Sequence, residues 1–367
     1  MPILTFNYLT TLIQPLTPKE RMRRCLWRQP VDRLPVQTNF TGTMGANLAA
    51  HFQCTPAELP LRLDNHLLRV TTAHPPRLSA NGLISYDWWG AGWGTATEGY
   101  WHAEAPLAGA TAPAELDAYP WPDPTRNFDR KAVRELAQRL YETTDKGIIM
   151  PGFGSGIMEM TLYLQGFDTG FMNMLVDKPL AGYLLDKVTD LKMAYAEQML
   201  EAAGDYCHVI YGGDDLGHQN NLAIRPELFR ELMLPRYKRY HSFLKLKAPH
   251  IKIFFHSCGC IYELIPDLIE AGVDILNPVQ VNAAEMGDTA RLKREFGRDI
   301  TFWGGIDTQH VMPHGTPQEV KEEVKRRIND LAPGGGYVFD TVHNIQADVP
   351  GENVIALAEA LDEFGWY

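Results

Sequence analysis

The sequence has few cysteines for its length, and their spacing is not that of a disulfide framework. The five cysteines of the 367 residues are Cys25, Cys54, Cys207, Cys258 and Cys260. An odd and scattered set excludes a small disulfide-stapled scaffold. It predicts a reducing compartment, which we take to be the cytoplasm, with most of the thiols buried.

Long hydrophobic runs and dense positive charge are also missing. Residues 1–24 have no positive charge ahead of their apolar residues and no long apolar core, so we expect neither a signal peptide nor a membrane span. The formal net charge is −11, and no basic cluster is dense enough to predict a nucleic-acid surface. There is no GxGxxG after the first predicted strand and no Walker sequence, which leaves nucleotide-binding folds without support.

What is present is an alternation of strand-like and helix-like segments, about eight times along the chain. The predicted strands are Val36–Asn39, Gly147–Pro151, Tyr206–Tyr211, Ile251–Phe255, Asp274–Pro278, Ile300–Trp303 and Tyr337–Asp340. The segments between them are long enough for covering helices, and Thr316 to Glu319 forms a capping box. This pattern favours an α/β fold, a (β/α)8 TIM barrel in a single domain of residues 1–367, over a doubly wound sheet. We expect residues 1–70 to form an N-terminal helical extension.

Residues 83–127 differ in character from the rest of the chain. They hold five of the eight tryptophans, interleaved with Gly and Pro, and no helical or strand period extends across them. Long irregular segments in compact domains usually serve a function or cover a site. We expect an insertion that forms a lid or a pocket wall; a plain surface loop is the alternative.

Polar residues follow most of the predicted strands, and in a barrel these positions converge on one face. They are Asn39, Gly152–Ser155, Tyr211, Asp214, Asp215, His256, Cys258, Gln280, Trp303, Asp307 and His343. We expect Asp214 and Asp215 to act as a general acid or a substrate anchor, against the alternative that either caps a turn or helix. The predicted substrate-binding residues are Asn39, Tyr211, Gln280 and Trp303.

The stretch Ile251–Cys260, IKIFFHSCGC, predicts a metal site at a strand end. His256 and Cys258 are two residues apart and share one side of an extended chain. A catalytic zinc ion takes three protein ligands and keeps one position open, so a third ligand must come from elsewhere. His343 is the best-placed candidate, with Cys260 and Gln280 as alternatives. The competing interpretation is a buried strand whose Cys and His are inert.

Several motifs together resemble one family. They are KER at 19–21 with PVDRLP at 30–35, GGDDLG at 212–217, RPELFRELMLPRYKR at 225–239, HSCG at 256–259 and FDTVHNIQADVPGENV at 339–354. The chain resembles the uroporphyrinogen decarboxylase superfamily, which also contains corrinoid-dependent methyltransferases. The resemblance implies a (β/α)8 barrel with its site at the C-terminal mouth.

Two features indicate whether the chain resembles the decarboxylases or the methyltransferases of this superfamily. The decarboxylases carry an N-terminal arginine-rich motif for substrate carboxylates, whereas PVQTNFTGTMGANL at 35–48 has no arginine. The methyltransferases hold zinc with His-x-Cys and a distant Cys; His256 and Cys258 match the first two, and His343 stands where the third is expected.

The resemblance thus implies a zinc-dependent methyltransferase that moves a methyl group between a small substrate, such as a methyl ether (O-demethylation) or a thiol, and a corrinoid (cobalamin), free or on a partner protein. A porphyrinogen-type decarboxylase and a non-catalytic barrel that binds a corrinoid or small ligand are the alternatives. A homodimer and a monomer are both compatible with it.

Overall fold

Seven parallel strands form one curved sheet in the computed structural model, which describes residues 15–70, 76–96, 101–126 and 128–367. The strand order is β1-β6-β7-β8-β9-β10-β11, so each strand lies beside the next barrel strand in the sequence. Their bounds are β1 Leu67–Arg69, β6 Gly147–Pro151, β7 Val209–Gly213, β8 Lys252–His256, β9 Ile275–Asn277, β10 Thr301–Trp303 and β11 Tyr337–Val338. Parallel neighbours need crossover connections, and helices supply them here.

An eighth, irregular member closes the sheet into a barrel. Gln37 N–H donates to Phe339 O (3.0 Å) on one side of this segment, and on the other side Val36 O accepts from His66 N–H (2.9 Å). Residues 35–39 therefore lie between β11 and β1, where the sequence predicts a short strand. The (β/α)8 prediction is confirmed. Residues 1–70 contribute this segment and β1 to the barrel, in addition to helices.

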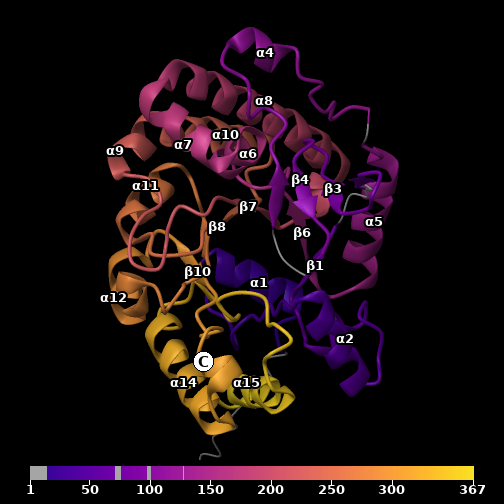
Figure 1. Cartoon of the computed structure of the whole chain (residues 1–367). Helices are drawn as coiled ribbons and strands as arrows, with labels where there is room; N and C mark the ends of the chain where they lie inside the picture. Colours follow the sequence, from indigo (N-terminus) through magenta and orange to yellow (C-terminus); the bar gives the residue numbers. More distant parts are fainter. Residues whose placement is uncertain (1–14, 71–75, 97–100, 127) are drawn as a thin grey trace, which may run out of the picture.

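Helices surround the strands, as Figure 1 shows for α5, α8, α12, α14 and α15. The helices are α1 Pro18–Leu26, α2 Gly42–His51, α3 Leu59–Arg62, α4 Pro113–Asp117, α5 Arg130–Thr143, α6 Ile157–Gln165, α7 Phe167–Val176, α8 Lys178–Ala203, α9 Pro226–Leu228, α10 Leu234–Lys247, α11 Ile265–Glu270, α12 Thr289–Phe296, α13 Val311–His314, α14 Pro317–Leu331 and α15 Gly351–Phe364. The capping box predicted at Thr316 begins α14. Within the described ranges, we find no helix with the length and apolar character needed to cross a bilayer.

Helix α1 closes one end of the barrel. Its Met22, Cys25 and Leu26 join a buried cluster with side chains from the barrel strands, among them Ile275 and Val338. The Cys25 thiol donates to the carbonyl of Tyr337, the first residue of β11, so the helix lies at the amino ends of the strands. The carboxyl ends are left for the site, as the barrel architecture requires.

The tryptophan-rich segment contains regular structure that the sequence does not reveal. Three of its strands, β3 Ile84–Tyr86, β4 Gly92–Gly94 and β5 His102–Glu104, form a second, antiparallel sheet with β2 Arg77–Leu78, which precedes the segment. Strands of two or three residues are too short to show a period of two, so the expectation of an irregular segment was wrong. In this sheet and its loops, Trp89 packs against Phe153 (ring centroids 4.4 Å apart) and Trp93 against Tyr163 (4.7 Å). Through these contacts the second sheet packs against the β6–α6 loop and helix α6.

Candidate metal centre

A cavity of about 420 Å³ lies at the carboxyl ends of the strands. Its polar lining includes Asn39, Arg69, Glu159, Asp215, His256 and His343. Tyr211 and Trp303, two of the predicted substrate-binding residues, also line it. The described residues of 83–127 do not line it, so this part of the tryptophan-rich segment forms no wall of the cavity.

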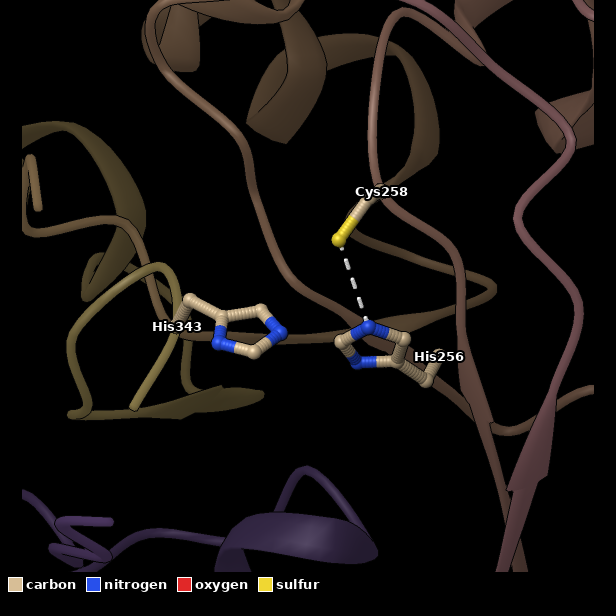
Figure 2. A group of neighbouring side chains, drawn as sticks. All are labelled: His256, Cys258 and His343. Carbon is tan, nitrogen blue, oxygen red and sulfur yellow. Dashed lines mark hydrogen bonds between the residues drawn. The ribbon is translucent and has the colours of Figure 1, made fainter. Parts of the chain in front are cut away.

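The structure brings the three predicted metal ligands together. One donor atom each from His256, Cys258 and His343 lies within 4.8 Å of the other two. Cys258 Sγ is 3.3 Å from His256 Nε2, and the rings of His256 and His343 are 5.6 Å apart by centroid. Figure 2 shows the His343 ring and the Cys258 sulfur directed at His256 from two different loops. Among the described residues, this is the group of His, Cys, Asp and Glu side chains close enough to share a metal ion.

The tautomer of His256 follows from its neighbour. Asn277 Nδ2 donates to Trp303 O (3.3 Å), which turns the amide oxygen of Asn277 towards His256. That oxygen lies 2.7 Å from His256 Nδ1, so Nδ1 carries the proton and donates. The lone pair is then on Nε2, the nitrogen that faces Cys258. A ligand histidine is commonly oriented in this way by a hydrogen bond at its other nitrogen.

The turn that carries Cys258 is held by two side chains. Asp215 Oδ1 accepts from Cys258 N–H (2.8 Å), and Gln280 Oε1 accepts from Gly259 N–H (2.6 Å). Gly259 has φ +86°, and a Cβ there would lie 2.3 Å from the carbonyl carbon of Gly217, so only glycine fits. Gln280, predicted to bind substrate or metal, does not line the cavity and instead positions this turn.

Cys260, the other alternative third ligand, points elsewhere. Its thiol donates to Glu285 Oε2 (3.0 Å), and it is not part of the group around His256. The geometry therefore favours His343 over both Cys260 and Gln280 as the third donor.

The two adjacent aspartates have different surroundings. Asp214 is fully buried and accepts from the backbone N–H groups of Met158 (2.9 Å) and Glu159 (2.7 Å) and from the Tyr237 hydroxyl. Burial raises the pKa of its carboxyl to about 7. It caps helix α6 and does not line the cavity, which favours the capping role over the catalytic one. Asp215 does line the cavity, with Oδ1 3.9 Å from His256 Nε2.

Comparison with known proteins places this architecture in a family. The family model described as "Uroporphyrinogen decarboxylase (URO-D)" matches residues 105–364. The chain belongs to the URO-D family. A solved methyltransferase from Methanosarcina mazei has the same fold, with a TM-score of 0.69 and 21% identity over 95% of this chain and 99% of that one.

The relatives of this URO-D family member include a methyltransferase and decarboxylases. A methylated-thiol–coenzyme M methyltransferase of Methanosarcina mazei is 26% identical over 190 residues, 51% of this chain and 46% of the relative. The chain thus spans about half the length of that relative. A uroporphyrinogen decarboxylase of Actinobacillus succinogenes is 24% identical over 366 residues, 94% of this chain and 97% of the relative.

Two carboxyl groups near the URO-D cavity were missed by sequence reasoning. Glu159 accepts from the Tyr163 hydroxyl (2.9 Å), and burial, with the charges of Asp214 and Asp215, raises its pKa to about 8. Asp340 accepts from Trp303 Nε1 (2.9 Å), and burial raises its pKa to about 7. Asp340 ends the predicted strand Tyr337–Asp340 and stands in the motif FDTVHNIQADVPGENV, a signal that could have found it. Glu159 gives only a weak signal, as an acidic residue in the first turn of a helix.

The donor set suits zinc. Ligand atoms about 2.0–2.3 Å from one tetrahedral zinc lie roughly 3.5 Å from each other, close to the 3.3 Å between Cys258 Sγ and His256 Nε2. Two imidazole nitrogens and one thiolate are ligands that zinc accepts, and the cavity beyond His256 and His343 leaves a position open. The carboxylate of Asp215 adds negative potential on the same side, which favours a bound cation.

Proposed function

We propose that this chain is a zinc-dependent methyltransferase. It moves a methyl group between a small substrate, a methyl ether or a thiol, and a corrinoid that is free or carried by a partner protein. The observation that carries the proposal is the convergence of His256, Cys258 and His343 within 4.8 Å at the mouth of a 420 Å³ cavity. The methyltransferase name of one relative supports the same reading.

His256, Cys258 and His343 would hold the ion. When bound, zinc supplies a Lewis acid that stabilises a thiolate or polarises an ether oxygen. Around it, Asn277 fixes the tautomer of His256, and Asp215 holds the amide of Cys258.

Glu159 keeps a proton in the cavity at neutral pH because burial raises its pKa to about 8. Its carboxyl would deliver that proton to the oxygen or sulfur that loses the methyl group. The raised pKa places this acid close to the working pH, where a general acid is most effective.

The charge of the cavity supports methyl transfer over porphyrinogen decarboxylation. Arg69 is the one lysine or arginine among the described residues that line it, alongside the carboxyl groups of Glu159, Asp215 and Asp340. A tetrapyrrole with eight carboxylates would find few partners here. All five cysteines are free thiols, which supports the cytoplasm as the location.

The test combines metal analysis with a methyl-transfer assay. We expect about one zinc per chain. We also expect the zinc-loaded protein to transfer a methyl group to free cob(I)alamin from at least one of a panel of methylated thiols and methyl ethers. Formation of methylcobalamin is measured by its absorbance. Cys258→Ala should abolish both properties, and Cys260→Ala, the matched control, should keep both. Consumption of uroporphyrinogen by metal-free protein would establish the decarboxylase instead. Binding of cobalamin without transfer from any donor would establish the non-catalytic barrel.

A further inference from the structure

One positive charge in the cavity, that of Arg69, is in no close ion pair with a carboxylate of the described residues. Arg69, the last residue of β1, donates to Asn39 Oδ1 (3.3 Å), and its guanidinium carbon lies 5.1 Å from the centroid of the Tyr211 ring. It forms no ion pair with any residue in the described part of the chain. A guanidinium has five N–H donors, and to the described residues Arg69 gives one hydrogen bond, from Nη2 to Asn39. Arg69 is also the one lysine or arginine among the described residues of the lining.

A network of hydrogen bonds orients Asn39, the residue to which Arg69 donates. Asn39 Nδ2 donates to Asp340 Oδ2 (3.2 Å), which fixes the amide so that its oxygen faces Arg69. Asp340 is buried and also accepts from Trp303 Nε1 (2.9 Å) and from its neighbour Thr341 N–H (2.8 Å). The Asp340 carboxyl therefore accepts from donors of its own and orients Asn39, and the charge of Arg69 acts on it without a close ion pair between the two.

The charges of the cavity are distributed unevenly. Asp215 lies on the side of the candidate metal ligands, because its Oδ1 accepts from Cys258 N–H (2.8 Å) and is 3.9 Å from His256 Nε2. Arg69, Asn39 and Tyr211 form another part of the lining. Arg69 ends β1 and His256 ends β8, and strands β6 and β7 lie between them in the sheet. A ligand that spans the cavity would thus meet the candidate metal ligands and Asp215 on one side and Arg69 on another.

We propose that Arg69 is the anion-binding residue of this site and that the substrate is a small organic anion. Its carboxylate, sulfonate or phosphate group pairs with the Arg69 guanidinium, while its methylated or methyl-accepting sulfur or oxygen reaches the position bounded by His256 and His343. This inference rests on the proposed function for the metal end. A guanidinium suits such a planar or tetrahedral oxyanion because it can donate two parallel hydrogen bonds.

The test measures binding of matched acid and amide probes by calorimetry, without corrinoid. The pairs are (methylthio)acetate with (methylthio)acetamide, and 3-methoxybenzoate with 3-methoxybenzamide, so that an aliphatic and an aromatic frame are both covered. In at least one pair, the unmodified protein should bind the acid about tenfold or more tightly than the amide, the effect of one charged hydrogen-bonded contact. Arg69→Gln should reduce this preference to within about threefold, and Arg69→Lys should retain part of it. Arg77→Gln, which changes an exposed arginine outside the cavity, should leave it unchanged.

Several results would overturn the proposal. No preference for either acid, no binding of any probe, or an unchanged preference in Arg69→Gln would remove Arg69 as an anion site. An unchanged preference together with weakened transfer from a corrinoid protein, but not from free cobalamin, would assign Arg69 to the partner's surface instead. Zinc content is measured on the same samples: a preference for acids in protein that binds no zinc would retain the anion site and contradict the proposed function.

Discussion

Asn277 Oδ1 lies 2.7 Å from His256 Nδ1, and this contact determines which nitrogen of the ring faces Cys258. Removing the acceptor frees the ring to rotate and to change tautomer. We expect Asn277→Leu to weaken zinc binding by roughly 10–100-fold, the usual effect of losing such a contact, as measured by competition with a chromophoric chelator. Asn277→Asp retains an acceptor and should bind zinc at least as tightly as the unmodified protein. Equal affinity in Asn277→Leu would mean that the ring is held by other contacts.

The identity of the third donor is tested at His343. We expect His343→Ala to lose zinc under dialysis conditions that leave the unmodified protein loaded, because two donors from one strand end do not complete a site. His343→Cys supplies a thiolate at the same position and should restore binding. Cys260→Ser is the control, since that thiol bonds to Glu285 and lies outside the group. Full zinc content in His343→Ala would exclude this histidine as a ligand.

The turn after Cys258 should depend on a single glycine. Gly259→Ala forces a Cβ to within 2.3 Å of Gly217 and places an alanine at φ +86°, so we expect a loss of about 1–3 kcal/mol or more in unfolding free energy and weaker zinc binding. Gly212→Ala adds a Cβ in the same region of the barrel with no atom within 4 Å, and its stability should change little. Chemical denaturation and metal titration on both variants make the comparison. A smaller loss at Gly259 than at Gly212 would contradict the geometry.

A pH-dependent stability is expected from Glu159. Its pKa in the folded state is raised from 4.5 to about 8, chiefly by burial. The contribution of the neutral carboxyl to the free energy of unfolding is therefore complete below pH 4.5 and is lost as the pH rises towards 8. Glu159→Gln keeps the neutral shape without the ionisation. In metal-free samples, we expect this variant to be more stable than the unmodified protein at pH 8, by about 1–3 kcal/mol, and to lose the advantage near pH 4.5. Urea denaturation across this range measures the difference, and a gap independent of pH would contradict it.

Much of the candidate site could be predicted because its signals are local or follow strand ends. The two-residue spacing of His256 and Cys258 at the end of an apolar run places both on one side of the chain. His343 was reached because it follows the last predicted strand, and the structure brings it to the same place. Whether these residues bind zinc stays a prediction.

The features that could not be predicted depend on the direction of single side chains and on contacts between residues far apart in the sequence. Asp214 and Asp215 are adjacent and chemically identical, yet successive side chains of an extended segment point to opposite sides, so one caps α6 and the other lines the cavity. Arg69 was missed because β1 has only three residues, too few for a period, and lies in the stretch expected to be a helical extension. Glu159 matters only because burial changes its pKa, and burial is a property of the folded chain.

The placement of residues 35–39 between β11 and β1 has a consequence for how the site is assembled in a cell. Phe40 also pairs with Ile345, two residues beyond His343, so closure of the ring and placement of His343 depend on the same late part of the chain. A nascent polypeptide whose synthesis has reached only Cys258 can offer a metal ion two donors and no more. For the proposed zinc site, the third donor is thus available only after translation of this region, and the zinc content of a preparation would report the fraction of molecules in which the ring has closed.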